Sequence, residues 1–189
     1  MSTAAAPMTM AEFLALPDDG TERWLIAGEL RERERPMPYR NRFHSRVTTT
    51  TATELEIWSR QQPTPRGQVL TGDAGFRLSR DPDTIFGLDI AYVSASVVTG
   101  QTTETTIIDG LPILAVEILS PNDTHEDIND KIDMLLTAGV PLVWIIDPRR
   151  RTVTVHRPGA EPELVNVRQE LSGEPHLPGF HIPVARLFE

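Results

Sequence analysis

Two apolar runs on either side of one well-capped helical segment constrain the fold of this chain more than any other feature. The first run is PILAVEILS at residues 112–120, and the second is PLVWIIDP at residues 141–148. Neither run alternates polar with apolar residues, which is typical of strands buried on both faces of a sheet. The segment at residues 124–139, THEDINDKIDMLLTAG, predicts a helix because Thr124 can cap it, acids crowd its first turns and Gly139 stands where it should end. Strand, helix and strand within about 35 residues predict a right-handed crossover between two parallel strands.

The rest of the chain predicts further strands and helices around this unit. In TMAEFLALP, Thr9 and Glu12 have the spacing of a capping box, so a short helix should run from about Met10 to Leu16. RWLIAGELRERE predicts two strands that turn at Gly28, and near-helical spacing of apolar residues predicts a long helix over about residues 40–62. Other expected strands are QVLT and GFRLS, with a break at GDAG between them, then LDIAYVS and RTVTVHR.

Length and composition narrow the class of protein. The 189 residues suffice for one core and contain no linker-like stretch, so we predict a single domain over residues 1–189. Long connections and extra hairpins count against a regular doubly wound fold, so the expected class is α/β or α+β. No signal-peptide pattern or membrane-length apolar run is found, so a cytoplasmic location is expected. Because the chain has no cysteine, disulfides, thiolate catalysis and cysteine-ligated zinc are excluded.

Charge is unevenly distributed along the sequence. The formal net charge of −9 works against tight, sequence-independent binding to a polyanion, because such binding uses many Lys and Arg contacts to phosphates. The segment Arg31–Arg46 nevertheless holds six arginines against two glutamates. It could be a charged hairpin that keeps a sheet edge soluble, or a surface that contacts phosphates.

Two acids lie in runs that should be buried. Glu117 belongs to the first apolar run, and Asp89 lies among apolar neighbours in LDIAY. An ionised carboxylate in such a place needs a partner, a metal ion or a proton. Taken singly, either acid could instead lie at a strand end and face water.

Lys131 is the only lysine in the chain, beside seventeen arginines. If the strand ends near residue 120 and the helix returns antiparallel over the sheet, Glu117 and Lys131 each lie roughly 10 Å from the turn and come level. A helix salt bridge with Asp127 is the alternative, although arginine would serve that purpose equally well. A lysine offers a compact charge that can orient a water or stabilise an oxyanion. We therefore expect Lys131 to point at Glu117.

These residue types also suggest a chemistry. Two carboxylates and nearby backbone carbonyls are the oxygen ligands that Mg²⁺ prefers. Such an ion could lower the pKa of a bound water and polarise a phosphoryl oxygen. Asp89, Glu117 and Lys131 together suggest hydrolysis of a phosphodiester.

Several motifs, taken in order, resemble the PD-(D/E)XK nuclease superfamily and, more closely, its Uma-type branch of restriction-endonuclease-like bacterial proteins. They are MTMAEFLALP, GEL at 28–30, His44, LDIAYVS, VEILSP, Lys131, AGVPLVWIIDP and LPGFHIPVARLF. The resemblance covers most of the chain. It implies a restriction endonuclease-like fold, with a central mixed sheet flanked by helices and additional β-hairpins, and a homodimer.

The resemblance also implies a set of site residues. Asp89 corresponds to the metal-binding aspartate, Glu117 to the acidic member of the (D/E)XK element, and the Ile118 carbonyl to a further metal ligand. The usual lysine position, two residues after the acid, holds Leu119 here. We therefore take Lys131 as the lysine that has migrated to the helix.

The N-terminal part of the resemblance is less regular. Glu29 matches an early acidic position that joins the site. Leu25 replaces a glutamate common in the family, Ala27 replaces an aspartate, and Leu88 replaces the proline before the metal-binding aspartate. A histidine on a helix flank, such as His44, is more often structural or solvent-facing than catalytic, although it could contact a phosphate.

The leading hypothesis is a Mg²⁺-dependent endonuclease of DNA, with Mn²⁺ as the alternative ion. Asp89 and Glu117 would bind the metal, and Lys131 would position or activate the attacking water. One alternative is a dimeric nucleic-acid-binding or interaction protein that keeps the fold without useful cleavage. Another is a metal hydrolase of small phosphoesters, because the site residues say little about the leaving group.

Overall fold

The predicted strand–helix–strand unit is the centre of the fold in a computed structural model that describes residues 6–33, 41–102, 104–121 and 123–189. Strands β6 (Leu114–Ile118) and β7 (Leu142–Asp147) are parallel neighbours, and helix α4 (His125–Ala138) connects them. The Thr124 hydroxyl accepts the Asp127 N–H in a capping box, and Gly139 ends the helix in the left-handed conformation at φ 97°. All five residues of β6 are buried, as an apolar run without alternation predicts.

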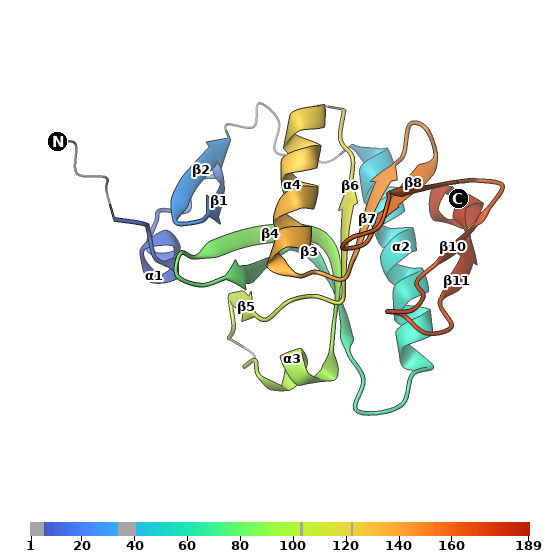
Figure 1. Ribbon diagram of the computed structural model, residues 1–189, viewed down its shortest axis with the longest axis horizontal. Coiled ribbons are helices and arrows are strands. Elements are labelled where there is room, and N and C mark those ends of the chain that lie inside the picture. The colour runs from blue at the N-terminus through green and yellow to red at the C-terminus, as the bar shows by residue number, and fades with distance from the viewer. Residues whose placement is uncertain (1–5, 34–40, 103, 122) are drawn as a thin grey trace.

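Within the described residues, nine strands form one mixed sheet (Figure 1). The order is β2-β1-β4-β6-β7-β8-β9, with β3 paired to β4 and β5 paired to β3. The further strands of this sheet are β1 (Glu22–Ile26), β2 (Glu29–Arg33), β3 (Gln68–Ser79), β4 (Thr84–Val93), β5 (Ile107–Asp109), β8 (Thr152–His156) and β9 (Glu163–Asn166). β10 (Glu170–Ser172) and β11 (His181–Pro183) form a separate antiparallel pair. The other helices are α1 (Met10–Leu14), α2 (Arg42–Arg60), α3 (Ala95–Thr99) and the 3₁₀ segment η1 (Val184–Phe188).

Helices cover both faces of the central strands. Alternate residues of a strand point to opposite faces, so neighbouring residues of β6 pack against different helices. On one face α2 packs through Val47 and Leu55 in a core cluster that also contains Val116 of β6. On the other face α4 packs through Leu135 in a cluster that contains Ala115 of β6. The prediction of a mixed sheet flanked by helices with additional hairpins is confirmed.

The prediction of a break at GDAG was wrong. β3 is one strand of 12 residues, and both of its halves pair with β4. The irregularity is a bulge between Thr71 and Ala74, where Gly72 and Asp73 have positive φ values of 85° and 57°. A bulge bends a strand without reversing it, so turn-forming residues at this place do not divide β3.

Other boundaries differ from the predictions by smaller amounts. α1 ends at Leu14, and the described residues between LDIAYVS and PILAVEILS, for which no element was predicted, contain α3 and β5. The predicted start of the long helix and much of the Arg31–Arg46 segment fall on residues 34–40, which lie outside the described residues. In the part of the chain that is described, no helix is long and apolar enough to cross a membrane.

The hairpin of β1 and β2 is docked beside β4 through main-chain contacts. The Gly28 N–H donates to the Asp83 carbonyl, and the Gly28 carbonyl accepts the Met8 N–H, both at 2.8 Å. Gly28 has φ 77°, and a Cβ at this position would lie 2.4 Å from the Pro7 Cβ. Only glycine fits this crowded, left-handed position. The turn thereby fixes one wall of the cavity described below.

Candidate active site

Asp89 is held where the pairing of β4 and β6 ends. The register of the two strands runs from Tyr92 with Leu114 to Ile90 with Val116. One residue further along each strand are Asp89 and Glu117, which the register places side by side. The Asp89 carboxylate accepts the Ile118 N–H at 2.8 Å and is only 7% exposed. The two acids that the sequence singles out are therefore neighbours on adjacent central strands of the sheet.

Lys131 lies level with Glu117, as the comparison of strand and helix lengths predicts, and its side chain faces that acid. The Lys131 Nζ donates to Glu117 Oε2 at 2.9 Å, and the side chains are 28% and 9% exposed respectively. The same ammonium lies 5.4 Å from the centre of the Phe86 ring. Lys131 on α4 thus reaches Glu117 on β6, while its catalytic role stays a prediction.

His44 is the residue whose position the sequence interpretation missed. Its Nε2 lies 3.3 Å from Asp89 Oδ2, and its Nδ1 lies 3.4 Å from the Thr48 hydroxyl. At 3% exposure it is buried, whereas the neighbouring Phe43 is 46% exposed. Residues 44, 47, 51 and 55 follow helical spacing, and all four are buried. That periodicity, extended back from Val47 to His44, is the signal that could have identified it.

The electrostatics of the cluster formed by Asp89, Glu117 and Lys131 favour a bound cation. Burial raises the pKa of Glu117 from 4.5 to about 7, with Asp89 and Asp73 adding to the rise and Lys131 opposing it. Burial acts to lower the pKa of Lys131, but the charge and hydrogen bond of Glu117 outweigh burial and raise it. Lys131 therefore stays protonated. Keeping both buried carboxylates ionised, those of Asp89 and Glu117, costs free energy.

A small oxygen-ligated ion fits the donors present. Among the described residues no group of three or more His, Cys, Asp or Glu side chains is placed to hold a metal. Within the same part of the chain, Glu117 Oε1 is a buried acceptor without a hydrogen-bond partner. Mg²⁺ is usually bound through one or two carboxylates and keeps several waters. Asp89, Glu117 and the Ile118 carbonyl would be its protein ligands.

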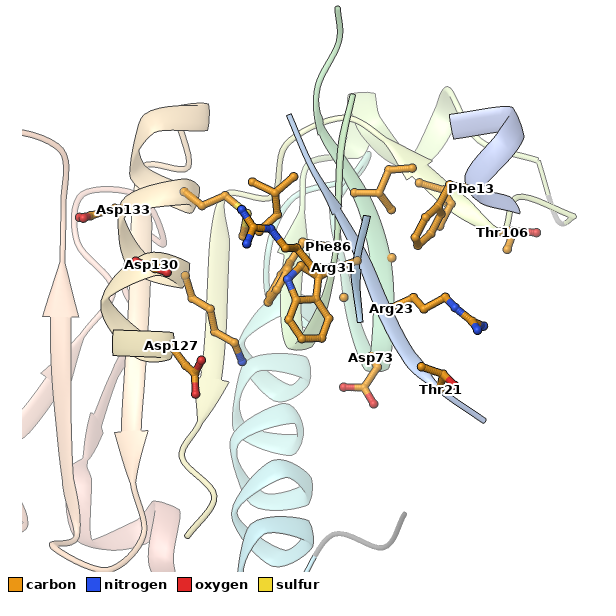
Figure 2. Close-up of a pocket in the computed structure, with 18 of the residues that line it drawn as sticks. Phe13, Thr21, Arg23, Arg31, Asp73, Phe86, Thr106, Asp127, Asp130 and Asp133 are labelled. Carbon is orange, nitrogen blue, oxygen red and sulfur yellow. The ribbon is translucent and has the colours of Figure 1, made fainter. Parts of the chain in front are cut away.

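Lys131 also lines a cavity of about 840 Å³ between α4 and the β1–β2 hairpin (Figure 2). The α4 side contributes three aspartates, Asp127, Asp130 and Asp133, and the hairpin contributes Arg31. Trp24 and Phe86 pack edge to face in this wall, with ring centres 6.5 Å apart. The lysine ammonium is therefore reached from a space large enough for a substrate.

Three other positions of the family pattern are Glu29, Leu25 and Leu88. Glu29 begins β2, is 72% exposed and pairs with Arg31 at 3.0 Å. Its described contacts do not include Asp89, Glu117 or Lys131, and its role stays a prediction. Leu25 and Leu88, which replace a glutamate and a proline of the pattern, are fully buried. Both leucines serve the apolar core.

The mixed sheet flanked by helices, with two acids on neighbouring strands and a lysine on the crossover helix, is the arrangement that the resemblance to nucleases predicts. The model of the Uma2 family, described as "Putative restriction endonuclease", matches residues 10–185. The chain therefore belongs to the Uma2 family.

A solved structure shows the same fold. It is a protein from Anabaena variabilis ATCC 29413 described as "a putative nuclease belonging to DUF820". The two chains share 22% sequence identity with a TM-score of 0.78, and the match covers 96% of this chain and 98% of the other. A comparison with curated proteins finds no match.

Proposed function

We propose that this protein is a metal-dependent endonuclease that hydrolyses phosphodiester bonds of DNA, with Mg²⁺ as its ion and Mn²⁺ as a substitute. Membership of the Uma2 family supports nuclease-like chemistry. The observation that carries the proposal is the 2.9 Å contact of Lys131 Nζ with Glu117 Oε2, next to the carboxylate of Asp89. Acid, acid and ammonium in one buried cluster match the needs of phosphodiester hydrolysis.

Each residue has a distinct proposed role. Asp89 and Glu117, with the Ile118 carbonyl, would hold the ion, and a bound ion would lower the pKa of a water and neutralise charge on the phosphate. Lys131 remains protonated, orients the attacking water and stabilises negative charge on a phosphoryl oxygen. His44 fixes the orientation of the Asp89 carboxylate from α2, as groups behind a metal ligand commonly do.

Nicking of supercoiled plasmid in Mg²⁺ or Mn²⁺ tests the assignment. Glu117→Ala and Lys131→Ala should each lose most of the activity, because each removes a proposed participant. Glu126→Ala is a matched control, since this exposed glutamate lies in the first turn of α4. Full activity in both site variants would refute the assigned roles.

The net charge of −9 and Leu88 in place of the motif proline favour a second candidate function. In it the protein keeps the nuclease fold and binds nucleic acid or a protein partner without useful cleavage. Titration calorimetry separates the two functions: heat of binding with Mg²⁺ or Mn²⁺ that is lost in Glu117→Gln supports the enzyme. No binding at millimolar metal supports the second function.

We also propose that the protein is a homodimer and that Glu29 contributes to the site from the hairpin. Both rest on the family resemblance. Light scattering coupled to size-exclusion chromatography measures the dimer directly, and a monomeric mass would refute it.

A further inference from the structure

Exposed arginines gather near the C-terminal ends of β6 and β7, close to the catalytic cluster of Asp89, Glu117 and Lys131. One group lies in the first turns of α2, which is also the helix that places His44 against Asp89. The other group lies in the turn between β7 and β8. We call the five residues the arginine edge: Arg42, Arg46, Arg149, Arg150 and Arg151, all of which are exposed.

The strand register places the second group at this edge. β6 and β7 are parallel, with Glu117 opposite Ile145 and Ile118 opposite Ile146. The turn after β7 therefore begins just beyond the level of Glu117. Its shape is fixed, because Asp147 Oδ1 accepts the Arg149 and Arg150 N–H groups at 2.9 and 3.0 Å.

The two groups of arginines are joined through the last residues of the chain. Arg46 Nε donates to the Glu189 carbonyl at 2.8 Å. The Arg151 guanidinium lies 5.7 Å from the centre of the Phe188 ring. Because Phe188 and Glu189 are consecutive, residues about 100 positions apart in sequence form one continuous surface.

An exposed aromatic side chain lies within this surface. Phe43 is 46% exposed, between Arg42 and Arg46 on α2, while the buried stripe of the helix passes through His44. An aromatic ring among arginines is the combination that binds single-stranded nucleic acid, in which bases stack on rings and guanidinium groups contact phosphates.

We propose that the arginine edge and Phe43 bind an unpaired DNA strand next to the catalytic cluster. The inference deepens the proposed function and rests on it for the position of the strand. An intact duplex presents no free base face to Phe43. The net charge of −9 opposes the binding of any nucleic acid through many phosphate contacts. A local surface still attracts a strand, since charges farther away than about 10 Å are screened at ordinary salt. The favoured substrate is therefore DNA with an unpaired segment.

Fluorescence anisotropy with a labelled oligothymidylate and a blunt duplex, in EDTA to prevent cleavage, tests the inference. The wild type should bind the single strand more tightly than the duplex. Phe43→Ala should weaken single-strand binding by about 5- to 150-fold, because one base loses its stacking partner. Arg149→Gln combined with Arg150→Gln should lower the slope of log affinity against log salt by about 1.4, the value for two phosphate contacts.

Matched controls lie on the same helix, about 20 Å or more along α2 from Phe43. Ile57→Ala removes an apolar side chain that is 48% exposed, and Arg60→Gln removes an arginine that is 71% exposed. Both should bind like the wild type. No single-strand binding by the wild type, or unchanged binding in the Phe43 and double-glutamine variants, would overturn the inference.

The outcomes separate this inference from the nuclease proposal. Single-strand binding that depends on Phe43, without cleavage in Mg²⁺ or Mn²⁺, supports the surface and refutes the enzyme. Cleavage by a protein whose Phe43→Ala variant binds normally refutes the surface alone.

Discussion

Replacing Glu117 by glutamine should make the metal-free protein more stable above pH 7. The amide keeps an oxygen that can accept the Lys131 hydrogen bond, but it carries no charge. Burial raises the pKa of Glu117 from 4.5 to about 7, so the folded state retains a proton that the unfolded chain has released. The wild type therefore loses stability as pH rises from 4.5 to about 7, and the glutamine variant does not.

The expected size of this effect follows from the two pKa values. At about 1.4 kcal/mol for each pH unit between them, ionising the buried carboxylate costs about 3 kcal/mol in total. Because the unfolded chain has already begun to ionise at pH 5, the measurable change between pH 5 and pH 8 is about 2–3 kcal/mol. Titrating groups that do not interact with Glu117 behave alike in both proteins and cancel in the difference.

Urea unfolding in EDTA at a series of pH values gives the required free energies. The stability of Glu117→Gln relative to wild type should increase by this amount from pH 5 to pH 8. Glu161→Gln, at an exposed loop position, is the control and should follow the wild type. A difference that stays constant, or that falls with rising pH, would refute the reasoning about burial at this site.

Two further predictions concern the same cluster, and a third concerns Glu29. Mg²⁺ at ten times its dissociation constant should stabilise the wild type by about 1.4 kcal/mol in thermal unfolding, since binding to the folded state alone raises stability. The same concentration should leave the stability of Asp89→Asn nearly unchanged. His44→Ala should weaken Mg²⁺ binding by about 10- to 100-fold in calorimetry, because the Asp89 carboxylate loses the group that orients it. His176→Ala, at a histidine outside the cluster, should bind as the wild type, and equal affinities in both variants would count against a role for His44. Glu29→Ala should change unfolding free energy by less than about 1 kcal/mol, since its pair with Arg31 is exposed. A loss of nicking in that variant supports its place in the site, and full nicking argues against it.

The sequence was most informative where its signals are local. Thr124 and Gly139 mark the ends of α4 as predicted, and the apolar runs became β6 and β7 in the expected parallel pairing. The prediction that Lys131 lies level with Glu117 also needed only the rise per residue of a strand and of a helix. The chain encodes these features within short stretches, through capping groups and hydrophobic period.

Turn-forming residues were a weaker guide. GDAG was expected to divide two strands, yet β3 continues through it as a bulge because both halves pair with β4. The same residue types can reverse a strand or only bend it. The partner strand decides between these outcomes, and it lies elsewhere in the sequence.

Tertiary structure alone decided which side of α2 faces the sheet. The helical period of α2 allowed either Phe43 or His44 to face the core, and packing against the sheet buried His44 beside Asp89. The contacts of Arg46 and Arg151 with the last two residues likewise bring together distant segments. Spacing fixes which residues share one face of an element, whereas the rotation of that element and the order of the strands depend on packing throughout the core.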